Sequence, residues 1–69
     1  MDLHWEEGFT IDVRFENGAA VIRANREGLL SLANHLRALS EASAGSHIHL
    51  DQWNALEDGS VELILERIE

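Results

Sequence analysis

The sequence predicts a small α+β domain, a two-layer sandwich in which one helix packs on a four-stranded, mainly antiparallel sheet. Three observations predict this class: an alternating apolar and polar pattern before residue 25, leucines at helical spacing after it, and two short apolar segments towards the end. The element order is strand–strand–helix–strand–strand. Because a helix with one apolar face needs a sheet beneath it, we expect all four strands in one sheet. No linker, repeat or low-complexity tract divides residues 1–69, so we expect one domain.

Residues 9–24 read as a β-hairpin. The first strand has an apolar residue at every second position, which is the period of a half-buried strand. Asn17-Gly18 follows, a pair that favours the positive φ angles of a type I′ turn. The second strand carries Val21 and Ile22 on opposite faces, so the sequence leaves its buried face open. The alternating apolar residues of the first strand are Phe9, Ile11, Val13 and Phe15.

A helix is expected over residues 26–44. Asn25 is a suitable N-cap, Glu27 places negative charge in the first turn, and Gly45 is the natural C-cap. His35 falls on the flank of the apolar stripe, where we expect a partly exposed histidine with satisfied hydrogen bonds. The stripe consists of Leu29, Leu32, Ala33, Leu36 and Leu39.

The stretch "GSHIHLD", residues 45–51, contains the third predicted strand. Its polar residues stand at every second position, with Ile48 and Leu50 between them. If these two face the helix, the polar side chains face away from it. The last strand lies in "SVELILERIE", after the turn residues Asp58-Gly59, and repeats the alternation. The polar residues of the third strand are His47, His49 and Asp51.

Two readings of His47 and His49 stay open. The two imidazoles could converge on a zinc ion, with a third ligand from Asp51, Glu62 or Glu66. Alternatively, they line the solvated or partner-binding face of a sheet that is covered on one side only. One His-x-His without a second ligand cluster lacks the spacing of a zinc signature. We therefore expect no cofactor and keep metal binding as the alternative.

Two tryptophans stand among acidic residues. Trp53 lies in the loop "QWNALEDG" with Glu57 and Asp58, and Trp5 precedes the first strand. Each could fold over an end of the sheet and close a small core. An aromatic anchor ringed by carboxylates is also typical of the centre and rim of a protein interface. The predicted partner-binding residues are His47, His49, Asp51, Trp53, Glu57 and Asp58.

Charge and composition restrict the function. Five arginines against thirteen Asp and Glu leave a net charge of −8, which repels phosphate backbones and anionic membranes. We expect no nucleic-acid partner, and such a surface suits a basic protein, although solubility alone also accounts for acidity. No apolar run reaches the ~18 residues of a membrane span, and we find no signal-peptide pattern, so we expect a cytoplasmic protein.

Catalysis is not expected. The chain has no cysteine, no glycine-rich phosphate loop and no G-x-S-x-G motif. A 69-residue layered domain also offers little concave, water-excluding volume for tuning acid–base groups. At this size a homodimer, joined through the open sheet face or an exposed strand edge, is a further expectation.

The segments "NREGLLSLANHL" and "GSHIHLDQWNALEDGSVELILERI" resemble proteins of the immunity protein 32 family, antidotes associated with bacterial polymorphic toxin systems. The resemblance covers about residues 25–68. It implies a stand-alone antidote that binds a cognate toxin domain and blocks it without chemistry of its own. The toxin would be basic if it acts on nucleic acid, and an acidic antidote could then be steered onto it. The resemblance assigns no individual residue to toxin contact.

Overall fold

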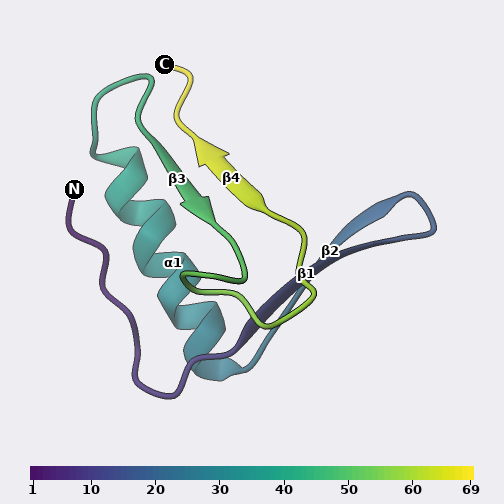
Figure 1. The fold of residues 1–69 in the computed structure, drawn as a ribbon. Helices are drawn as coiled ribbons and strands as arrows, with labels where there is room; N and C mark the ends of the chain where they lie inside the picture. The colour runs from purple at the N-terminus through teal and green to yellow at the C-terminus, as the bar shows by residue number, and fades with distance from the viewer.

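The computed structural model describes residues 1–69 and confirms the α+β class and the predicted order of elements (Figure 1). The prediction of one four-stranded sheet is wrong. The first two strands pair only with each other, and so do the last two, which gives two separate two-stranded antiparallel sheets. The elements are β1 (Ile11–Glu16), β2 (Ala19–Ala24), α1 (Arg26–Ser40), β3 (His47–Leu50) and β4 (Leu63–Glu66).

The two sheets stay separate because of the segment that leads into β4. Residues 57–61 run past the edge of β1 and donate two backbone hydrogen bonds, to the carbonyls of Ile11 and Val13, each at 2.9 Å. The Ser60 hydroxyl accepts a third bond from the Val13 amide at 3.1 Å. Between these contacts the chain turns at Gly59, which has a φ of +83°. The segment therefore touches β1 at isolated points and forms no continuous ladder with it.

The predicted hairpin forms, but only its base is buried. Asn17 and Gly18 have φ angles of 51° and 81°, as a type I′ turn requires. Ile11 and Val13 lie in the core, whereas Phe15 is 70% exposed. In Figure 1 the outer part of β1 and β2 extends away from α1 and from the other sheet. The half-buried pattern predicted for β1 therefore holds for its first half only, because the strand is longer than the layer that covers it.

The helix begins where the sequence predicts and ends earlier. The Asn25 side chain accepts a hydrogen bond from the Gly28 amide at 2.7 Å, which confirms the N-cap. α1 ends at Ser40 with Glu41 as its C-cap, so the predicted end at residue 44 and the C-cap role of Gly45 are wrong. Gly45, with a φ of +89°, instead turns the chain into β3, and its amide donates to the Arg67 carbonyl at 2.7 Å. The helix lacks the length and apolar character that a membrane-spanning helix needs.

The buried face of α1 is rotated from the predicted stripe. Leu32 and Leu39 are buried as expected, but Leu29, Ala33 and Leu36 are exposed. Two small residues, Gly28 and Ser31, are buried instead. The first turn of the helix lies directly against the start of β1, which leaves no room for a larger side chain at Gly28. A Cβ atom at Gly28 would overlap the Thr10 carbonyl oxygen and press against Ala24. The buried residues of α1 are Gly28, Ser31, Leu32, His35 and Leu39.

His35 departs most from expectation. The sequence predicts a partly exposed, hydrogen-bonded side chain, but His35 is wholly buried, and neither ring nitrogen has a hydrogen-bond partner. Burial lowers the pKa of His35 below its ordinary value of 6.5, and nearby His4 lowers it further. The N-terminal segment covers this side chain, with Trp5 packed against both His35 and Phe9. Trp5 thus closes the core, one of the two roles left open for it.

Candidate functional site

β3 places two histidines on the open face of the second sheet. Ile48 and Leu50 are buried, whereas His47 and His49 are exposed, which confirms the predicted alternation. The two imidazole rings meet edge to face with their centroids 4.8 Å apart. This arrangement follows from the strand itself, in which residues two apart share a face.

The structure places one carboxylate beside the two histidines. His49 Nδ1 lies 3.3 Å from the Glu62 carboxylate, in a contact where both side chains are about half exposed. Asp51, one of the proposed third ligands, is engaged elsewhere in the loop. No three His, Asp or Glu side chains are grouped so that they could hold a metal ion. The partner-binding reading and the zinc reading of His47 and His49 both stay predictions.

The loop after β3 is held in one shape by Asp51 and Asn54. The Asp51 carboxylate accepts hydrogen bonds from the amides of Trp53 and Asn54, at 2.8 and 3.1 Å. Asn54 in turn accepts from the Asp51 amide at 2.9 Å and donates to the His49 carbonyl at 3.0 Å. These reciprocal bonds form the kind of side-chain turn that Asp and Asn favour. Asp51 is therefore a turn-forming residue as well as a source of negative charge.

This turn presents Trp53 to solvent. Its side chain is 85% exposed, the largest value among the big apolar residues of the chain. Three residues later, Leu56 is buried in the core and anchors the other end of the turn. The loop is closed further on, where the Gly59 amide donates to the Gln52 side chain at 3.0 Å. A large aromatic side chain is thus held out on a rigid support instead of covering the core.

Glu57 and Asp58 complete the loop. Both are exposed, and no cationic side chain lies within ion-pair distance of either. The Glu57 amide is tied to the Ile11 carbonyl, so the backbone that carries these charges is also anchored. The loop therefore combines an aromatic side chain with two uncompensated carboxylates.

Two residues of this surface, Ile64 and Glu66, were not among the predicted partner-binding residues. Ile64 of β4 lies directly opposite His49 in the strand register and is half exposed on the same face. The alternation in "VELILE" placed Ile64 opposite Leu63 and Leu65, but it could not show which face was covered. We use the name open face for the exposed side of β3 and β4, formed by His47, His49, Ile64 and Glu66.

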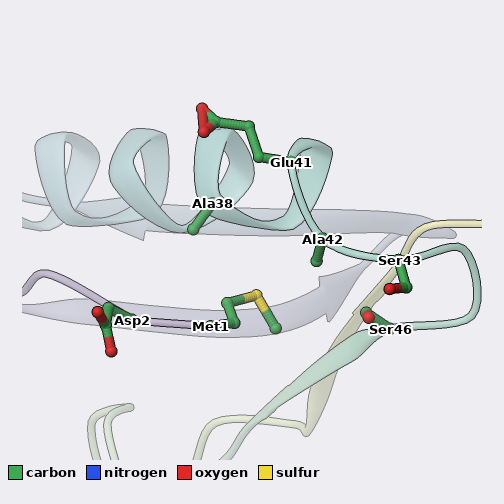
Figure 2. A pocket seen from close by; sticks show the side chains of 7 residues that line it. All are labelled: Met1, Asp2, Ala38, Glu41, Ala42, Ser43 and Ser46. Atoms are coloured by element: carbon green, nitrogen blue, oxygen red, sulfur yellow. The ribbon is translucent and has the colours of Figure 1, made fainter.

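A separate hollow lies at the C-terminal end of α1. It measures about 490 Å³ and opens between the N-terminal residues and the end of the helix (Figure 2). Figure 2 shows Met1 and Asp2 facing Ala38 and Ala42, while the Glu41 side chain points away from them. None of its lining residues is fully buried, and none belongs to the predicted site. The hollow offers no set of groups that would select a particular ligand.

The chain matches a known protein family. The model of the immunity protein 32 family matches residues 20–68, most of the chain. This match confirms the resemblance seen in the sequence and includes α1, the second sheet and all six predicted site residues. No curated protein and no solved structure matches the chain.

Proposed function

The chain belongs to the immunity protein 32 family, and from this premise we propose that it binds a cognate bacterial toxin and blocks it by occlusion. It performs no chemistry of its own in this role. The toxin-binding surface comprises the open face and the loop that follows β3. Its predicted contact residues remain His47, His49, Asp51, Trp53, Glu57 and Asp58.

The observation that carries this proposal is the exposed Trp53 on its rigid turn. Tryptophan is enriched among the residues that dominate binding energy at protein interfaces. A loop whose backbone is already ordered loses little conformational entropy when a partner binds it. The four hydrogen bonds between Asp51, Trp53, Asn54 and His49 order the backbone that carries the indole before binding. Trp53 is therefore suited to insert into an apolar pocket of the toxin.

Charge supports a basic partner. The chain carries −8, and Glu57 and Asp58 stand unpaired beside the aromatic anchor. Complementary charge accelerates association of two proteins and orients their encounter. A toxin that cleaves nucleic acid needs a basic surface, and an acidic antidote can cover it. We propose that the encounter takes place in the cytoplasm, where such a toxin would find its substrate.

A growth assay tests this function. The chain is co-expressed with the C-terminal domain of the large open reading frame beside its gene, and colony survival is counted. Survival with this chain, and death without it, is the expected result. Loss of survival with Trp53→Ala, but not with Leu36→Ala on the exposed side of α1, would assign protection to the loop. Death in the presence of the well-expressed wild-type chain would contradict the proposal.

A further inference from the structure

The hairpin of β1 and β2, residues 11–24, has no role in the surface described above. We propose that two copies of this chain pair through the free edge of β2, antiparallel, so that two hairpins form one four-stranded sheet. The proposal does not depend on the toxin-binding function. It follows from the backbone, the charge and the side-chain sizes of the hairpin.

The backbone of β2 has an unpaired edge. The amide and carbonyl of Val13 point towards residues 57–61. Because backbone groups alternate in direction along a strand, those of its neighbours in β1 point the other way and bond to β2. In the register that pairs Arg14 with Val21, the amides and carbonyls of Ala20 and Ile22 then point outward. No backbone hydrogen bond outside the regular elements involves residues 14–23. A strand edge with free donors and acceptors is a template for pairing with another strand.

The charge of the hairpin permits self-association, unlike that of the rest of the chain. β2 contains no Asp or Glu, although the chain has thirteen. Within the hairpin, two carboxylates are matched by two arginines, so the segment is neutral while the whole protein carries −8. The Asp12 carboxylate lies 3.2 Å from the Arg14 guanidinium and 3.7 Å from that of Arg23. A second copy therefore meets little like-charge repulsion at this edge and more elsewhere.

Side-chain sizes also match in a self-pairing centred on Val21. This register places Ala20 opposite Ile22 of the second copy, and Val21 opposite its own copy. Phe15 pairs with Ala20 within one hairpin, and both share a face with Ile22. The small methyl group of Ala20 leaves room for Phe15 to reach Ile22 of the second copy from the adjoining strand. Phe15 and Ile22, which are 70% and 44% exposed in one copy, would cover each other.

Such a dimer leaves the toxin-binding surface free. The six predicted contact residues lie in β3 and the following loop, and none belongs to the hairpin. The outer part of the hairpin extends away from β3 and β4, which form the open face (Figure 1). Dimerisation and protection from the toxin can therefore be measured separately.

Analytical ultracentrifugation of the full chain tests the pairing. Over roughly 10 μM to 1 mM, the mass is expected to rise from 7.7 kDa towards twice that value. Ile22→Lys should weaken dimerisation at least about tenfold, because it places a charge on the edge. Leu29→Lys, a matched change on the exposed side of α1, should not. A wild-type chain that stays monomeric, or a dimer that both variants weaken equally, would overturn the proposal.

Cross-linking provides a second test that does not depend on the lysine variant folding. The chain has no cysteine, so Val21→Cys introduces a single thiol with little change in size. Opposed residues of an antiparallel pair lie ~4.5–5.5 Å apart, within the reach of a disulfide. Val21→Cys is expected to form dimers in air faster than Leu29→Cys. Equal rates of disulfide formation in the two variants would overturn the proposal. A second result would also overturn it: a wild-type chain that is monomeric, together with an Ile22→Lys variant that no longer protects cells in the growth assay. The edge of β2 would then bind the toxin and not a second copy.

Discussion

The indole ring of Trp5 stands perpendicular to the imidazole ring of His35, with the two centroids 4.0 Å apart. The edge-to-face contact seals a histidine that has no hydrogen-bond partner at either nitrogen. A charged imidazole at this place would be unpaired and unsolvated, so burial favours the neutral form of His35 and lowers its pKa. The contact joins the N-terminal segment to α1.

Stability should fall as the pH drops below about 6.5. The pKa of His35 is lowered by burial and then by His4, so the unfolded chain binds a proton in a range where the native chain does not. The free energy of unfolding therefore decreases with falling pH, by up to about 1.4 kcal/mol per pH unit for one proton. Urea unfolding between about pH 5 and pH 7.5 measures this slope. His35→Met, which cannot titrate, should flatten it, and parallel slopes would contradict the assignment.

Gly28→Ala should destabilise the protein although alanine is the better helix former. Helix propensity alone would favour the change by about 1 kcal/mol. The new methyl group would overlap the Thr10 carbonyl and press on Ala24, so we expect a net loss of about 1–3 kcal/mol. Ala33→Gly, at an exposed position of the same helix, should cost about 1 kcal/mol from propensity alone. Denaturant unfolding of both variants decides the sign, and a stabilised Gly28→Ala would disprove the close approach.

Asn25 should contribute more than a helix cap. Its side-chain oxygen accepts from the amides of Gly28 and Thr10, at 2.7 and 3.0 Å, and its nitrogen donates to the Gly8 carbonyl at 2.9 Å. Asn25→Ala removes all three bonds and should cost about 1–2 kcal/mol. Asn25→Asp keeps both acceptor bonds, so it should cost less. Equal losses in thermal or urea unfolding would show that the donated bond, and not the cap, matters most.

Trp53→Ala should weaken toxin binding without weakening the fold. The side chain is almost fully exposed, so the melting temperature should stay near the wild-type value. Loss of an interface anchor typically costs at least about 2 kcal/mol, or about thirtyfold in Kd. Calorimetry with the cognate toxin domain measures this change. Leu36→Ala, also exposed but on α1, is the control, and an unchanged Kd in Trp53→Ala would remove the loop from the binding surface.

Neutralising the loop should slow association more than it speeds dissociation. Glu57→Gln, Asp58→Asn and Asp51→Asn together remove three charges, and the asparagine at position 51 retains the oxygen that accepts from the Trp53 amide. The association rate should fall by about tenfold and lose much of its salt dependence. Stopped-flow mixing at two ionic strengths tests this. As the control, Asp2 and Glu7 are neutralised, which should leave the association rate unchanged. An association rate in the triple variant equal to that of the wild type would show that other carboxylates, such as these two, steer the encounter.

The sequence by itself determined the local elements of this protein. The Asn17-Gly18 turn, the Asn25 cap and the inward direction of Ile48 and Leu50 all follow from neighbours within a few residues. The family resemblance was equally readable, since it rests on short stretches of sequence. The six proposed contact residues also came from local chemistry, and their role awaits the experiments above.

The tertiary structure decided how these elements meet. A periodic pattern shows that a strand or helix has an apolar face, but not how far another layer extends over it. For that reason Phe15 is exposed, His35 is buried, and the apolar stripe of α1 is rotated away from Leu29 and Leu36. The division into two sheets likewise depends on the path of residues 57–61 across β1. Burial and sheet pairing are set by contacts between residues far apart in the chain, and these are not encoded in any single segment.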